Sequence, residues 1–265
     1  MRNTNLAAVD IDKTAPLDGI ALERADLEWL VRRHQEKSVG EGEQPRRLNL
    51  QSALLSAVDG RYLPLEGANF SGVQLENANF SGAQLEGAIF IAAQLEGADF
   101  GSAQLEGAIF VGAQLEGANF VRAQLEGAKF IAAQLEGADF RLATISKATF
   151  GDATMITTQG IGPIVADVAG WDEHSLPINE WSRVKQLGDE AEAKKKRNED
   201  GKPRDATTRF RDYFAATRAY RQVATALDGM GRKEEAEKFA YRGQVMQRKM
   251  FWWSIWQKKR RGEVR

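Results

Sequence analysis

The chain has 265 residues, with 36 basic and 37 acidic side chains, two histidines and no cysteine. The absence of cysteine excludes a disulfide framework and thiolate chemistry, and it is typical of proteins of the reducing cytoplasm. No run of about 18 apolar residues occurs, and the acidic first residues do not resemble a secretion signal. We therefore expect a cytoplasmic protein without a membrane-spanning helix.

The near-zero net charge conceals two oppositely charged regions. Residues 61–160 hold 5 basic and 11 acidic groups, whereas residues 171–265 hold 23 basic and 15 acidic groups. This shift predicts separate modules and a polar partner for one of them. We expect an N-terminal segment with a capping helix over residues 1–47, a repeat domain with irregular end coils over residues 48–181, and a basic helical domain over residues 182–265.

The first predicted element is an amphipathic helix within residues 21–34. Three apolar residues and one histidine have helical spacing there: Leu27, Leu30, Val31 and His34. The ends of a repetitive β-structure expose unpaired backbone edges that need a cover. We expect this helix to lie near the first coil of the repeat, with a Gly-, Glu- and Arg-rich loop between them.

From Leu65 the chain repeats a ten-residue motif, Leu-Glu-Gly-Ala-x-Phe-x-x-Ala-Gln. Within it, a large apolar residue recurs at every fifth position up to Phe150, and from Ala68 onward a small residue lies two places before each of them. A period of five fits neither a helix nor a flat strand, so it predicts a coil of short extended segments joined by corners. Weaker signs of the period predict irregular coils around Leu50 and from Ile156 to Trp181.

This pattern resembles the pentapeptide-repeat family over residues 65–155. The resemblance implies a mainly β solenoid, a right-handed quadrilateral β-helix with four pentapeptides per coil. A coil of four pentapeptides has twenty residues and holds two ten-residue motifs. Leu therefore lines two opposite walls and Phe the other two, and residues of the same type stack on one another from coil to coil. Stacked coils lie about 4.8 Å apart, which predicts a short rod.

The outward residues of such a coil predict two acidic ladders and one apolar wall. The residue after each Leu is Glu, which gives one ladder of Glu66, Glu86, Glu106 and Glu126 and an opposite ladder of Glu76, Glu96, Glu116 and Glu136. Exposed apolar patches usually mark contact sites. The candidate interaction residues on one Phe wall are Ile89, Ile91, Ile109, Val111 and Ile131. The alternative is that terminal segments of the chain cover this wall.

After Trp181 the pattern becomes helical. Two apolar stripes with spacings of three and four, beginning at Phe210 and Ala236, flank a Gly-containing turn and predict an antiparallel α-helical hairpin. Residues 181–190 and 239–248 are similar to the helical segment that follows the repeats in a subset of bacterial pentapeptide-repeat proteins. In many of these a membrane region resembling an ion-channel pore comes next. This sequence departs from that pattern, because it stops at Arg265, so we do not expect channel activity, and a pore-less relative or partner subunit is one alternative.

The end of the second predicted helix combines aromatic and basic residues. Phe251, Trp252, Trp253 and Trp256 precede a run of four basic residues. This combination is typical of a helix lying on a membrane surface, and the alternative is that the aromatic side chains pack within the protein. Nucleic acid is an unexpected partner, because acidic residues flank the other basic run, residues 194–197.

Signals of catalysis are weak. Neither His34 nor His174 has companions at the spacing of a triad or metal site, and no phosphate-binding glycine loop is present. We expect no cofactor, no metal and no enzymatic activity, but a binding or scaffold protein with a protein partner or self-association. The family resemblance leaves a DNA-mimicking, topoisomerase-binding protein as the alternative, because the glutamate ladders approach the charge density of duplex DNA.

Overall fold

A computed structural model describes the chain over Leu17, residues 20–37, 47–51, 53–150 and 153–155, Val165, Val184, and residues 186–198 and 201–260. Two compact units are formed. The first comprises Met1–Met155 with Ala169–Pro177, and the second Ile156–Val168 with Ile178–Arg265. The closing coil predicted from Ile156 to Trp181 lies outside the described residues.

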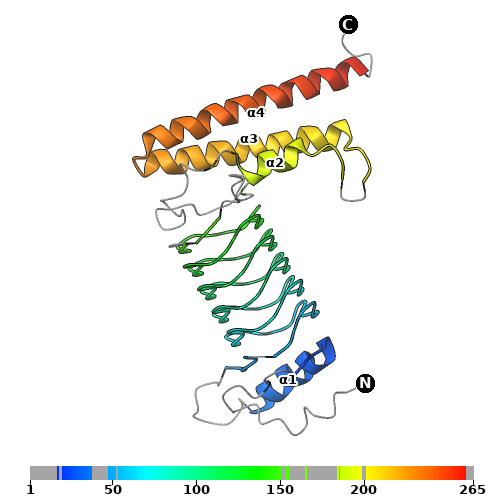
Figure 1. Cartoon of the computed structure of the whole chain (residues 1–265), viewed down its shortest axis with the longest axis vertical. Coiled ribbons are helices and arrows are strands. Elements are labelled where there is room, and N and C mark those ends of the chain that lie inside the picture. Colours follow the sequence, from blue (N-terminus) through cyan, green and yellow to red (C-terminus); the bar gives the residue numbers. More distant parts are fainter. Residues whose placement is uncertain are drawn as a thin grey trace. The chain divides into compact units, whose positions relative to one another are not determined.

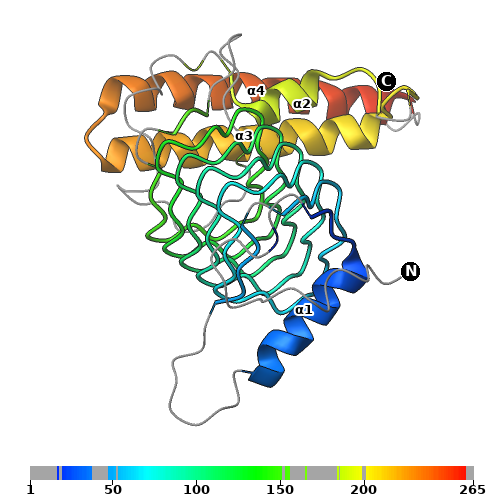
Figure 2. The ribbon, with the colours of Figure 1, turned by 60° about the horizontal axis from the view of Figure 1, so that its bottom comes forward.

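The first unit is a β solenoid with four walls. Every fifth residue from Asn49 to Gln134 forms a parallel bridge with the residue twenty positions further along the chain. Four such bridges complete one turn, and Figure 2 shows the coils as stacked four-sided outlines. Across the described residues the coils pair through single-residue bridges rather than longer strands. The predicted extended segments are therefore very short, because corner residues occupy two of every five positions. The right-handedness implied by the resemblance stays a prediction.

The corners are tight turns that direct the chain from one wall to the next. The N–H of Ala88 donates to the carbonyl of Leu85 at 3.0 Å, and Gly87 between them has a φ of +64°. A positive φ at the third residue is the feature of a type II turn and explains why the motif places glycine there. Ala92 and Leu142 adopt the same left-handed conformation without being glycine, with φ of 53° and 61°. The fold therefore imposes this corner even where the local sequence disfavours it.

Phenylalanine columns fill the axis of the solenoid. Phe70, Phe90 and Phe110 stack with ring centroids 4.8 and 4.9 Å apart and with nearly parallel planes. Rings on opposite walls meet edge to face, as Phe90 and Phe100 do at 5.7 Å and 80°. Both geometries are favourable for aromatic pairs, and each Phe from position 70 to 150 is essentially inaccessible to solvent. The prediction that each column stacks on its own kind is confirmed.

The solenoid begins earlier than its regular motif does. Leu50, Ala53 and Leu55 are buried, and Leu54 bridges both Gln74 above it and Ala21 of the preceding segment. The irregular first coil is thereby confirmed. Its corner at Arg61 and Tyr62 departs from the repeated motif.

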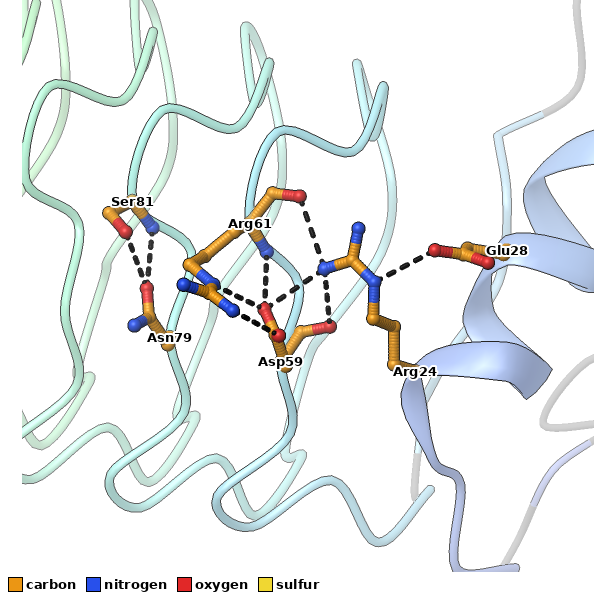
Figure 3. Close-up of polar contacts among 6 residues, drawn as sticks. All are labelled: Arg24, Glu28, Asp59, Arg61, Asn79 and Ser81. Carbon is orange, nitrogen blue, oxygen red and sulfur yellow. Dashed lines mark hydrogen bonds and ion pairs between the residues drawn. The ribbon is translucent and has the colours of Figure 1, made fainter.

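Helix α1, Arg24–Lys37, lies against this first coil (Figure 1). Leu27 and Leu30 are fully buried, and the backbone before the helix pairs with Leu54 at 2.9 and 3.0 Å. Arg24 donates to a carboxylate oxygen of Asp59 at 3.0 Å and to the backbone carbonyl of Arg61 at 3.3 Å (Figure 3). The predicted helix and its place near the first coil are confirmed, because these contacts satisfy backbone groups at the open edge.

The second unit is helical. Helix α2 spans Gly188–Lys194, α3 spans Ala206–Gly229 and α4 spans Lys233–Arg260. Asp205 caps α3 by accepting a hydrogen bond from the N–H of Thr208 at 2.7 Å. At the other end Arg232 N–H donates to Leu227 at 2.9 Å, and Gly231 has a φ of +76°, which is the usual glycine-containing helix stop. Helices α3 and α4 form the predicted antiparallel hairpin.

The seam of the hairpin depends on a glycine in α4. A Cβ placed on Gly243 would lie 3.3 Å from the Cβ of Tyr220, which is fully buried in α3. The absence of a side chain at Gly243 lets the two helices approach closely at this level. Phe239, one turn earlier on α4, packs against the ring of Tyr220 at 5.9 Å.

Candidate binding surfaces

The four walls of the solenoid differ in their outward side chains. We call the wall that contains Asp59, Asn79, Asp99, Asn119 and Asp139 the polar wall. Its side chains bond to their own corners: Asn79 accepts hydrogen bonds from the N–H and hydroxyl of Ser81 at 3.0 and 2.6 Å (Figure 3). Asn119 donates to Asp99 of the neighbouring coil at 2.8 Å. The hydrogen-bonding groups of this wall are thus largely engaged within the protein.

Salt bridges strengthen the first coil of the polar wall. Arg61 contacts both carboxylate oxygens of Asp59 at 2.9 and 2.8 Å (Figure 3). The hydrogen bond from the Arg61 side chain, helped by the charge of Arg24, holds the pKa of Asp59 well below its usual range. Helix α1 therefore docks beside an ionised carboxylate.

The opposite Phe wall is mainly apolar in its middle coils, although Lys129 also lies on it, and we call it the apolar wall. Its predicted interaction residues are Ile89, Ile91, Ile109, Val111 and Ile131. Ile91 and Ile131 are 42% and 40% exposed, while the other three are half-buried. Ile89 bridges Ile109 directly, and the corner that contains Ile91 pairs with the corner that contains Val111 at 3.0 Å. The structure therefore brings all five together on one wall over consecutive coils.

The two remaining walls carry the predicted glutamate ladders. Five of these glutamates have one carboxylate oxygen that is buried against the wall and accepts no hydrogen bond from any described residue. They are Glu86, Glu96, Glu106, Glu116 and Glu136. Burial, together with the charges of Glu86 and Glu126, raises the pKa of Glu106. Burial and the charges of Glu136 and Glu96 raise the pKa of Glu116 in the same way. The middle of each ladder is thus electrostatically unfavourable when ionised.

The outward face of α4 carries exposed aromatic side chains. Tyr241, Phe251 and Trp252 are 62%, 61% and 71% exposed. A hollow of about 380 Å³ on this face is lined by Gln244, Gln247, Arg248, Met250, Phe251 and Trp252. Trp253, in contrast, is half-buried, and the guanidinium of Arg209 in α3 lies 4.6 Å from the centre of its ring. The side chain of Trp256 lies outside the described residues.

Sequence reasoning missed a buried ionic cluster within the helical unit. Glu190 of α2 is 3% exposed, and it contacts Lys194 at 2.7 Å, Arg242 of α4 at 2.9 Å and the hydroxyl of Tyr220 of α3 at 2.5 Å. Burial opposes ionisation of Glu190, but hydrogen bonds from Lys194 and Tyr220 outweigh it and lower the pKa. Burial and the Glu190 contact raise the pKa of the Tyr220 phenol. The cluster joins three helices, and no spacing rule would have connected residues so distant in sequence.

The described residues contain no group of three or more His, Asp or Glu side chains able to hold a metal ion. His34 lies half-buried on α1, and His174 lies outside the described residues. None of the helices in the described part of the chain is long and apolar enough to cross a membrane. In the described part of the chain, the candidate binding surfaces are the apolar wall, the glutamate ladders and the outward face of α4.

Comparison with known proteins supports this description of the solenoid. The family model for pentapeptide repeats matches eight copies across residues 68–107, 98–133 and 123–156. This match confirms the family resemblance inferred from the motif. The finer resemblance of the helical segment to channel-associated relatives stays a prediction. The comparison with curated proteins gives no match.

Several solved structures are similar to the chain. A pentapeptide repeat protein from Nostoc PCC 7120 is 26% identical with a TM-score of 0.36, over 44% of this chain and 84% of that protein. One from the Arabidopsis thaliana thylakoid lumen is 26% identical with a TM-score of 0.29, over 48% and 80%. QnrB1, a plasmid-mediated fluoroquinolone resistance protein, is 20% identical with a TM-score of 0.33, over 55% and 86%.

Proposed function

We propose that this pentapeptide-repeat protein is a non-catalytic binding and scaffold protein whose apolar wall docks a second copy of the chain. One observation carries the proposal: isoleucine and valine side chains gather on one wall, while the opposite wall carries mainly polar residues that bond to one another or to their own corners. Water contact with such apolar side chains is unfavourable, and burying them against a partner removes that cost.

The regularity of the wall favours a second copy as the partner. Adjacent coils are separated by a constant distance, with Phe centroids 4.9 Å apart from Phe90 to Phe110 and from Phe110 to Phe130. In a dimer with a twofold axis the same wall of both copies meets itself, and the equal coil spacing of the two walls lets their side chains fit between one another. A stable interface buries about 800 Å² of surface on each partner, and five apolar side chains cover less than this area. We therefore expect a weak, concentration-dependent dimer.

The test is the mass of the protein in solution. Light scattering and sedimentation velocity over a range of concentrations should show a monomer–dimer equilibrium for the native chain. Ile91→Glu combined with Val111→Glu should keep the protein monomeric at every concentration, with unchanged circular dichroism. Val121→Glu is the matched control, since Val121 follows Phe120 on the polar wall as Ile91 follows Phe90 on the apolar wall. A monomeric native chain, or a dimer that survives the double substitution, would refute the proposal.

The glutamate ladders favour a second candidate, a protein that mimics the charge pattern of duplex DNA. The ladders repeat with the coil, about 4.8 Å apart on each of two walls. The buried carboxylate oxygens of the ladders and the raised pKa values of Glu106 and Glu116 reduce the negative charge that the ladders present. A supercoiling assay with purified gyrase and micromolar protein tests this candidate, and absence of inhibition would dismiss it.

A further inference from the structure

Most of α4 and the facing part of α3 are strongly basic. Residues 239–261 contain seven Lys and Arg residues and no acidic residue. The facing part of α3 adds Arg209, Arg211, Arg218 and Arg221, and its only carboxylate there, Asp212, is bonded to Arg204 at 2.7 Å. Arg242 is paired with Glu190, but basic residues outnumber acidic ones in these two stretches, so this part of the hairpin carries a net positive charge.

Aromatic side chains occupy the solvent side of the same helix. Tyr241 and Trp252 are separated by eleven residues, about three helical turns, so they share one face of α4. Arg248 lies one turn before Trp252 on that face and is exposed. Aromatic residues that remain exposed beside basic ones are unusual in a water-facing helix, because their burial would be favourable.

We infer that this face of α4 binds an anionic lipid surface. Phe251 and Trp252 enter the interfacial layer, and Arg248 contacts lipid phosphates. Trp rings favour the headgroup level, and basic residues near an anionic leaflet add electrostatic attraction. Charge complementarity selects this partner, since residues 239–261 present no carboxylate to repel it.

The structure also assigns different roles to two adjacent tryptophans. Trp252 is the exposed anchor, whereas Trp253 is half-buried beneath Arg209 and holds α4 against α3. The inference does not depend on the apolar wall of the solenoid. A chain with Ile91→Glu and Val111→Glu should bind lipid as the native chain does, so failure of either proposal is recognisable by itself.

Co-sedimentation of the full chain with vesicles provides the test. We expect binding to vesicles of phosphatidylcholine and phosphatidylserine in equal parts, little binding to phosphatidylcholine alone, and loss of binding as salt screens the charges. Phe251→Ser with Trp252→Ser should weaken binding at least about tenfold, since both apolar anchors are removed. Tyr62→Ser is the control, because Tyr62 is a 74% exposed aromatic residue of the solenoid.

Two further measurements keep the result unambiguous. Circular dichroism should show that the double variant retains its helices, because both substituted side chains are mainly exposed. Trp252→Phe should retain binding but reduce the blue shift of tryptophan emission on adding vesicles, whereas Trp253→Phe should leave that shift intact. Absence of binding by the native chain, equal binding by the double variant, or binding to duplex DNA but not to vesicles would each overturn the inference.

Discussion

Individual residues show how the backbone of the solenoid limits substitution. Gly107 has a φ of +67°, and an added Cβ would meet nothing within 4 Å. Any cost of substitution there comes from the backbone alone. We expect Gly107→Ala to lower the free energy of unfolding by about 1 kcal/mol and Gly107→Val to lower it further, because a β-branched residue tolerates this conformation least. Urea unfolding measures both, and a Gly107→Val variant as stable as the native protein would contradict the explanation.

A glycine in the helical unit is required for a different reason. Gly243 has ordinary helical backbone, but a side chain there would press against Tyr220. We expect Gly243→Leu to destabilise the helical unit by about 1–3 kcal/mol through overpacking. Ala240→Leu is the control, since Ala240 is exposed on the same helix. Thermal unfolding followed by circular dichroism should show a loss only for the first variant.

At the scale of elements, the glutamate ladders make the solenoid sensitive to pH. The folded-state pKa values of Glu106 and Glu116 are raised. At pH values between the unfolded-state and folded-state pKa values, the folded protein therefore binds more protons than the unfolded chain. The contribution of these groups to stability therefore falls as pH rises through their folded pKa values, and it recovers on acidification. Asp59 acts oppositely, because its lowered pKa means that its contribution is lost in acid.

Neutralising the middle of a ladder should reveal this effect directly. We expect Glu106→Gln to raise the melting temperature at neutral pH, and the gain to disappear once the native glutamate is protonated in acid. Glu66→Gln is the control, because Glu66 is exposed at the end of its ladder, with Glu86 as its one ladder neighbour. A gain from Glu106→Gln that is independent of pH would show that the carboxylate charge is not responsible.

At the scale of the whole molecule, two units have separate cores of different kinds. Phe110 is buried in the aromatic column of the solenoid, and Glu190 is buried in the ionic cluster of the helices. We expect Phe110→Ala to cost about 3–5 kcal/mol in the solenoid. Removing the charge at Glu190 by Glu190→Gln takes the carboxylate away from Arg242, whose side chain is 35% exposed, and should cost about 1–3 kcal/mol in the helical unit.

Hydrogen exchange read by mass spectrometry distinguishes the two effects. Each substitution should reduce protection mainly in the unit that contains it, because each unit is compact by itself. Equal loss of protection in both units after either substitution would show instead that they unfold as one.

The sequence by itself determined the solenoid, its inward columns and the helical hairpin, because strict periods of five and of three to four leave few ways to bury the large apolar residues. It also placed Ile89, Ile91, Ile109, Val111 and Ile131 on one wall, since twenty residues complete a coil. Only the tertiary structure decided which of Trp252 and Trp253 faces solvent, that Glu190 joins Tyr220 and Arg242, and that α1 reaches Asp59 through Arg24. These contacts link residues without a common period, so packing in three dimensions decides them.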